Sequence, residues 1–339
     1  MTEPEFPTPP RTPTADVPTR PDGPATGTSG ETRRPRRSVV VAVAIVAVAL
    51  VGGAATYFVL GSSHSASRES ATLALAFERG DESIFAMRMT VNGTVDLGSL
   101  GQQPIDMDMS QTIHWDVVRV ADDGTATVRM SATDVKGTMN GMAAPTGTGD
   151  TTATFTVTPD GRILDANGTA LGSTGSFGTG GFPGMNQLTP ILPDHPVQPG
   201  DSWEKHFSQD VPYGDGKIEY TARSSFDRYE DVQGVSAGVV QTHYTVPIDF
   251  SFDVGELGGM FGGSGEADLG PKGKNAVMTF GGQGTFAQTS WLDLDAKKLL
   301  RSHSTGEFGM TLSMPGLDKQ LGSDRFEISA TFTMDLARR

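Results

Sequence analysis

The sequence predicts a mainly β protein, in which one N-terminal transmembrane helix precedes an extracytoplasmic antiparallel β domain. Three observations support this prediction. Residues 39–60 form a run of 22 residues without a charge. Downstream, runs of alternating apolar and polar residues are separated by turn sequences such as Asp122-Asp123-Gly124. Apart from the uncharged run and a short stretch at 66–76, no segment shows sustained helical periodicity.

The first 38 residues are rich in Pro, Thr, Arg and Gly and contain almost no apolar side chain. Such a segment cannot bury enough apolar surface to offset the entropy lost on ordering the chain. Residues 1–38 are therefore predicted to be a disordered cytoplasmic tail.

The uncharged run at 39–60 has the length of a membrane span. At about 1.5 Å per residue it reaches roughly 33 Å, enough for a hydrocarbon core of about 30 Å. Four arginines stand just before it and no basic residue directly after it, which predicts a cytoplasmic N-terminus. The apolar part of a cleaved signal peptide is shorter, about 7–15 residues. We therefore expect a retained, single-pass signal anchor in the cell membrane, although residues 63–66 leave cleavage open as an alternative.

Charge and cysteine content narrow the functional classes. The chain has 26 basic and 40 acidic residues, of which six and five lie in the first 60, leaving 20 and 35 for the rest. A domain this acidic is not expected to bind nucleic acid by neutralising phosphates. The chain has no cysteine, so neither disulfides nor lipid attachment at a cysteine can contribute, and stability must come from a packed core.

After a spacer at 61–71, the β domain is expected to occupy residues 72–339 with about ten to twelve strands. Glycine-rich connections are expected at 172–184 and 255–275, and a helical turn at 186–193. The predicted strands are 84–97, 104–120, 125–135, 151–158, 162–171, one that begins at Trp203, 217–231, 238–254, 276–293, 299–313 and 325–336.

The domain shows two similar halves, 72–171 and 203–336. Residues 151–169 match 287–305 in pattern: each has a strand that ends at an aspartate turn, followed by a second strand. This weak repeat predicts two β-meanders facing each other. A barrel, a half-barrel, a strongly curved sheet and a sandwich remain as alternatives.

Five methionines are the candidate ligand-binding residues. They share apolar strand faces, and methionine adapts to irregular apolar ligands. Ordinary core packing is the default explanation of these residues, since a methionine-rich β core needs no ligand. By alternation, the strand at 104–120 should place its methionines on one face and its aspartates on the other, toward solvent. The five candidates are Met87, Met89, Met107, Met109 and Met130.

No catalytic residue, metal ligand or cofactor site is predicted. The match to G-x-S-x-G at 234–238 lacks the following helix that a nucleophile elbow needs. The six histidines show no metal-binding spacing, and the glycine-rich stretches lack nucleotide-binding motifs. Two Asp-x-Asp pairs, at 106–108 and 293–295, are each expected to lie on one strand face and to be solvated.

Several turn and strand-start motifs carry a family resemblance. Leu73–Phe77 with Glu78-Arg-Gly-Asp81, long paired strands with Asp123-Gly124, and Pro199–Trp203 together resemble a family of uncharacterised bacterial cell-envelope β-rich proteins. Many members of that family are lipoproteins of unknown function. The resemblance covers roughly residues 70–310, and this chain departs from it by having a helix anchor in place of a lipidated cysteine. A more remote similarity is to half-barrel lipoproteins that carry acyl chains; it supplies no site residues.

These observations predict a non-catalytic, membrane-anchored extracytoplasmic β protein that binds a lipid or another hydrophobic envelope molecule. The alternative is a structural or protein-interaction module of the cell envelope, with a hydrolase as a distant third. The expected partners are the membrane, through residues 39–60, and a hydrophobic small molecule or an envelope protein. The sequence leaves the oligomeric state open.

Overall fold

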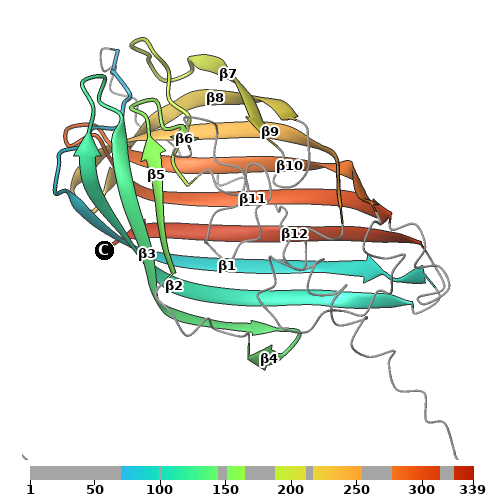
Figure 1. Ribbon diagram of the computed structural model, residues 1–339. Coiled ribbons are helices and arrows are strands. Elements are labelled where there is room, and N and C mark those ends of the chain that lie inside the picture. Colours follow the sequence, from blue (N-terminus) through green and yellow to red (C-terminus); the bar gives the residue numbers. More distant parts are fainter. Residues whose placement is uncertain are drawn as a thin grey trace, which may run out of the picture. The chain divides into compact units, whose positions relative to one another are not determined.

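One antiparallel sheet of 12 strands dominates the computed structural model (Figure 1). The structure describes residues 70–98, 101–143, 151–164, 188–210, 217–253, 277–313 and 324–339, and these contain no α-helix. Within those ranges, no helical segment has the length and hydropathy needed to cross a membrane. The predicted tail and the predicted transmembrane helix at 39–60 lie outside the described residues, as do the glycine-rich connections.

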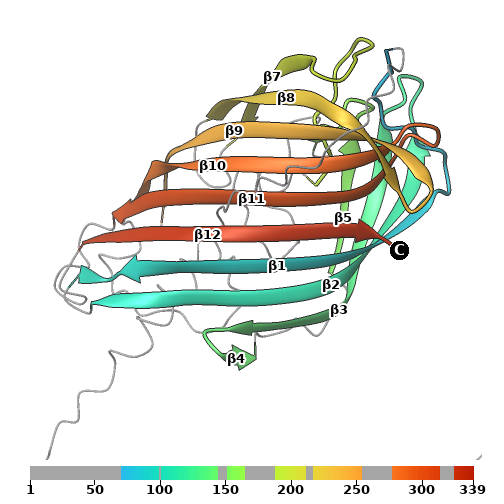
Figure 2. The same ribbon diagram turned by 180° about the vertical axis from the view of Figure 1, so that it is seen from behind.

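The strands follow the sheet order β6-β5-β3-β2-β1-β12-β11-β10-β9-β8-β7, with β4 paired to β3 off this path. Figure 2 shows the same order from behind. The bounds are β1 Glu82–Asp96, β2 Gln102–Val120, β3 Ala126–Met139, β4 Met142–Ala143, β5 Thr151–Val157, β6 Ile163–Leu164, β7 Ser202–Asp210, β8 Lys217–Val232, β9 Val235–Asp253, β10 Val277–Asp293, β11 Lys298–Ser313 and β12 Arg325–Arg338.

The two predicted meanders are present as β1–β6 and β7–β12, and they belong to one sheet. The first and last long strands pair along twelve residues, from Phe85 opposite Arg338 to Asp96 opposite Glu327. This pairing satisfies the backbone groups of two strands that would otherwise be free edges. The sandwich alternative is therefore wrong. The described sheet is also not closed, since β6 and β7 stand at opposite ends of its order.

The alternation read from the sequence is confirmed in the long strands. In β12, for example, Phe326, Ile328 and Phe332 are buried while Glu327 and Ser329 between them are exposed. We call the face that carries the buried side chains the inner face. The predicted strands agree with the observed ones to within a few residues. Of the strand predicted at 162–171, Ile163–Leu164 is observed, and residues 165–171 lie outside the described part of the chain.

Helical structure was expected at 66–76 and 186–193, and both expectations are wrong where the structure describes these residues. Residues 72–76 and 188–193 are irregular. Pro190 and Pro193 lack the N–H that a helix requires. The remaining backbone groups find partners elsewhere: the Leu192 N–H donates to Asp160 O at 2.8 Å, and residues 71 and 197 form an isolated antiparallel bridge.

These two irregular segments cover one end of the sheet, which we call the turn end because the short turns at 121–125, 158–162, 233–234 and 294–297 lie there. The segment at 70–81 is held by backbone hydrogen bonds from the Leu75 N–H to Pro159 O, 2.8 Å, and from the Ala76 N–H to Lys297 O, 3.0 Å. Both segments contribute buried residues to the core: Leu73, Leu75, Ile191 and Leu192.

Candidate ligand-binding face

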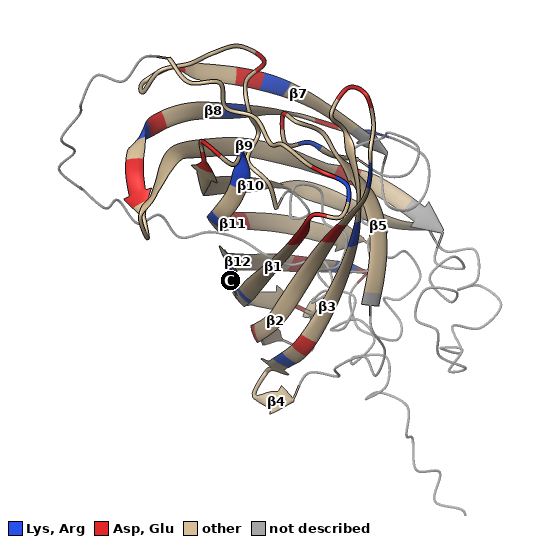
Figure 3. Ribbon diagram, turned by 90° about the vertical axis from the view of Figure 1, so that its left-hand side faces the viewer, with Lys and Arg blue, Asp and Glu red and all other residues tan. Residues whose placement is uncertain are grey.

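The inner face of the sheet is the candidate functional site because it gathers the predicted methionines and nearly all the buried aromatic residues. Figure 3 shows the sheet curving from β7 round to β5 when it is seen from its end. At the turn end its two edges come close, since Lys205 Nζ on β7 lies 3.8 Å from Asp160 Oδ2 in the turn between β5 and β6.

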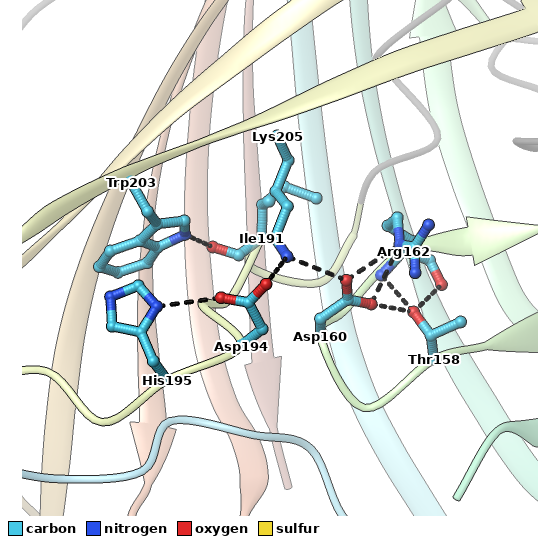
Figure 4. Close-up of polar contacts among 8 residues, drawn as sticks. All are labelled: Thr158, Asp160, Arg162, Ile191, Asp194, His195, Trp203 and Lys205. Atoms are coloured by element: carbon cyan, nitrogen blue, oxygen red, sulfur yellow. Dashed lines mark hydrogen bonds and ion pairs between the residues drawn. The ribbon is translucent and has the colours of Figure 1, made fainter. Parts of the chain in front are cut away.

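Side chains, rather than a ladder of backbone hydrogen bonds, join these two edges (Figure 4). Lys205 Nζ also lies 3.4 Å from Asp194 Oδ2, so one ammonium group links the turn at 158–162 to the segment at 188–197. The Trp203 indole donates to the Ile191 carbonyl at 3.1 Å. Asp160 in turn accepts hydrogen bonds from the side chains of Arg162 and Thr158, which fix its carboxylate.

We call the contacts of Lys205 and Trp203 with residues 158–162 and 188–197 the edge junction. The backbones of the two segments also lie close together there. Gly161 has a φ of +85°, and a Cβ added there would lie 1.8 Å from the Pro190 carbonyl oxygen. Thr189 Oγ1 donates to the Gly161 carbonyl at 2.6 Å. Only glycine combines this conformation with so close an approach, so the sequence at 161 is dictated by a contact between distant segments.

Asp194 is the most exposed carboxylate of the edge junction. The hydrogen bond from His195 Nδ1, at 2.9 Å, lowers the pKa of the Asp194 carboxyl, and the residue's own backbone N–H and the Lys205 ammonium lower that pKa further. The carboxylate is therefore ionised at neutral pH and keeps its attraction for Lys205.

A row of aromatic rings crosses the inner face. Phe207 stacks on Tyr220 at 5.0 Å between centroids, Tyr220 lies 5.6 Å from Tyr244, and Tyr244 stacks on Phe286 at 5.0 Å. Phe286 then meets Phe332 edge to face at 6.2 Å. Burial raises the pKa of both tyrosines above the ordinary value, and the neighbouring Tyr220 contributes to the shift of Tyr244. Both phenols therefore stay neutral in the folded protein.

Next to the aromatic row, toward the turn end, lies a group of buried polar residues that we call the polar belt. Its members are uncharged, come from four adjacent strands and occupy two consecutive inner-face rows in register. The Ser224 and Thr242 hydroxyls hydrogen-bond each other at 2.9 Å. The belt comprises Ser224, Thr242, Gln288, Ser290, Ser302 and Ser304, each at most 7% exposed.

The same two rows continue across β12, β1 and β2, where most of their side chains are methionines. Met334 lies opposite Ser304 and also opposite Met89, and Met89 lies opposite Met109. Met87 pairs with Gln111, whose side-chain amide donates to the Met87 sulfur at 3.3 Å. The row that contains Ser304 is therefore polar on β8–β11 and lined by methionines on β12–β2, while the row that contains Ser302 also carries Phe226, Val240 and Leu336.

The structure places the five predicted methionines unequally. Met87 and Met89 are buried, while Met107 and Met109 are half-buried and pack against the core. These four are neighbours on β1 and β2. Met130 is buried on β3 opposite Trp115, nearer the turn end and apart from the other four. The predicted alternation holds, since Asp106 is exposed and Asp108 forms an outer ion pair with Arg88 at 2.5 Å.

The residues of the polar belt were not predicted from the sequence, although the sequence of β11 contains a signal for them. Ser302 and Ser304 fall on the same alternation as Phe308, Met310 and Leu312 of β11, so polar residues occupy positions expected to face the core. An irregularity in register between Trp291 and Leu292 of β10 shifts the alternation of β11 near the turn end, and this obscures the pattern.

The G-x-S-x-G match at 234–238 and the Asp-x-Asp pair at 293–295 form no catalytic or metal-binding arrangement among the described residues. Ser236 lies within β9, which continues as a strand, so no nucleophile elbow forms. The expectation that Asp293 and Asp295 share one strand face is wrong. The strand β10 ends at Asp293, whose carboxylate accepts hydrogen bonds from the Asp295 and Ala296 N–H groups in a turn. No group of three metal-ligating side chains occurs among the residues that the structure describes.

No protein-family model and no curated protein sequence matches this chain. Among solved structures it is similar to DynF from the dynemicin biosynthesis pathway of Micromonospora chersina, at 9% sequence identity, covering 81% of this chain and 92% of that chain. The TM-score of 0.19 is too low for this similarity to bear on fold or function.

Proposed function

We propose that this protein is a membrane-anchored, non-catalytic binding protein that holds a lipid or another hydrophobic envelope molecule against the inner face of a half-barrel sheet. Residues 39–60 provide the anchor and place the β domain outside the cell membrane. The proposal extends the remote resemblance to half-barrel lipoproteins that carry acyl chains.

The observation that carries this proposal is the cross-strand row Met334–Met89–Met109, flanked by Met87 and Met107. Thioether side chains are unbranched and polarisable, so a surface built from them adapts to acyl chains of irregular shape. The adjoining aromatic row adds large apolar contacts from β8, β9, β10 and β12.

The proposal is tested by purifying the full-length protein and combining native mass spectrometry with organic extraction and lipid analysis. We expect a co-purifying hydrophobic molecule in stoichiometric amount. Recovery of a ligand-free protein that also binds no added lipid would contradict the proposal and favour the interaction-module alternative.

Adjacent positions on opposite faces of β2 provide a matched pair of variants. Met107→Glu places an unpaired carboxylate in the half-buried methionine surface, at a cost of several kcal/mol on ligand binding as an order of magnitude. Asp106→Glu adds only a methylene group on the exposed outer face. We expect the first variant to lose the bound molecule and the second to retain it, with circular dichroism confirming that both are folded.

A further inference from the structure

Three hydroxyl groups of the polar belt have no hydrogen-bond partner within the described protein. They belong to Ser290, Ser302 and Ser304, which are 1%, 3% and 7% exposed. Buried hydroxyls in native proteins are almost always hydrogen-bonded, because a buried hydroxyl without a partner loses its hydrogen bonds to water and gains none in the protein. Three such groups side by side therefore point to a polar group that comes from outside the chain.

These three hydroxyls form a compact set on the inner face of β10 and β11. Ser290 lies directly opposite Ser302, and Ser304 follows Ser302 on the same face at a spacing of about 7 Å along the strand. The remaining hydroxyls of the belt differ, since Ser224 and Thr242 satisfy each other. The three hydroxyls without a partner are thus neighbours on β10 and β11.

The surroundings of the three serines select the chemistry of the missing group. Phe286 and Phe332 of the aromatic row lie on one side, and Leu292 lies toward the turn end. No charged side chain occupies the inner-face positions that flank the belt in the described parts of β9–β12. A carboxylate or ammonium would be an unpaired charge there, whereas a carbonyl oxygen accepts hydrogen bonds from hydroxyl donors without a charge.

We infer that Ser290, Ser302 and Ser304 bind the ester group of the ligand through hydrogen bonds to its carbonyl oxygen. The ligand is then an acyl ester with apolar parts on both sides of the ester, rather than a pure hydrocarbon or a free fatty acid. This inference rests on the proposed function and narrows its ligand class.

The test compares three probes on the delipidated full-length protein: a long-chain wax ester, the alkane of equal length and a free fatty acid, each competing with a fluorescent apolar dye. Binding of the alkane tests only whether the protein binds an apolar molecule, as the proposed function requires. The ratio of ester to alkane affinity tests whether the serines bind an ester group. We expect the ester to bind about tenfold more tightly than the alkane, the effect of one or two hydrogen bonds.

The double variant Ser290→Ala/Ser302→Ala should reduce this preference to about twofold and leave alkane affinity unchanged. Ser329→Ala, on the exposed outer face of β12, should retain the full preference.

In the ligand-free protein Ser302→Ala should not lower the melting temperature, because it removes an unsatisfied group. Ser224→Ala should lower it, because the Thr242 hydroxyl loses its partner.

Several results would overturn the inference while the proposed function stands: equal affinity for ester and alkane, an unchanged preference in the double variant, or tighter binding of the free fatty acid. A fall in melting temperature for ligand-free Ser302→Ala would also contradict it, since the hydroxyl would then have a partner, such as buried water, without any ligand. If the protein binds none of the three probes, both proposals fail.

Discussion

Phe286 on β10 and Phe332 on β12 meet edge to face across β11, with their ring centroids 6.2 Å apart and Gly306 between them. A Cβ added at Gly306 would lie 2.7 Å from Phe286 Cδ1 and 2.9 Å from Phe332 Cε1. The two rings can therefore touch only because the middle strand has no side chain at this point.

Gly306→Ala should destabilise the fold by about 1–3 kcal/mol, because the new methyl group forces rings and backbone apart in a packed interior. Gly309→Ala on the same strand is the control, since its added Cβ meets nothing within 4 Å and its side is exposed. We expect that variant to be neutral or slightly more stable. Urea unfolding of the two variants measures the difference, and equal midpoints would disprove the packing role of Gly306.

Gly161→Ala tests the junction between the sheet edges. Gly161 and Gly234 share a φ of +85°, so the strain of an alanine in this conformation should destabilise the fold by the same amount, about 1 kcal/mol, at either position. At Gly161 the new Cβ also collides with the Pro190 carbonyl, while at Gly234 nothing lies within 4 Å. We expect Gly161→Ala to lose at least about 2 kcal/mol more than Gly234→Ala, as measured by chemical denaturation, with faster amide exchange at Leu192.

The buried tyrosines predict a loss of stability at high pH. Burial raises the pKa of Tyr220 and Tyr244 in the folded state, so the unfolded chain releases their protons first. Their contribution is complete below about pH 10 and is lost as the pH rises above it, at up to about 1.4 kcal/mol per pH unit for each tyrosine. Tyr220→Phe should make the free energy of unfolding fall less between pH 9 and pH 11, and an unchanged slope would contradict this assignment.

Acidification should weaken the contact between the segment at 70–81 and β11. Burial alone would raise the pKa of Asp81, but hydrogen bonds from Lys298 and the Glu78 backbone outweigh it and lower that pKa below 3.8. The contribution of Asp81 is therefore present above about pH 4 and is lost as the pH falls through its lowered pKa. In unfolding experiments from pH 5 to pH 3, Asp81→Asn and Lys298→Met should each lose less stability than the unmodified protein.

Topology can be tested independently of the fold. Because the uncharged run at 39–60 follows four arginines, protease added to intact cells should digest the β domain at 72–339 and spare the tail at 1–38. Permeabilised cells, in which the tail is also digested, provide the control. A shortened protein released into the medium would show that the segment is a cleaved signal.

The sequence by itself determined the strands, because an alternation of period 2 and turn sequences are local properties. The run from Ile105 to Ile113 placed Met107 and Met109 on the face opposite Asp106 before any tertiary information was used. The predicted aspartate turn at 122–124 is likewise present, with the Asp123 carboxylate accepting from the Thr125 N–H. Local patterns also indicated the apolar methionine surface, although they could not show which methionines are neighbours.

Only the tertiary structure decided how the strands assemble, since the pairing of β1 with β12 joins residues more than 200 positions apart and leaves no local signal. The same pairing brings Met334 beside Met89, and the pairing of β11 with β12 places Ser304 opposite Met334. The alternation of β11 places Ser302 and Ser304 on the side of Phe308, but it does not show what lies beside them. They become a candidate site only when the curvature of the sheet buries them beside Ser290 with no partner. Gly161 likewise acquires its role from Pro190, a residue brought to it by the fold and not by the local sequence.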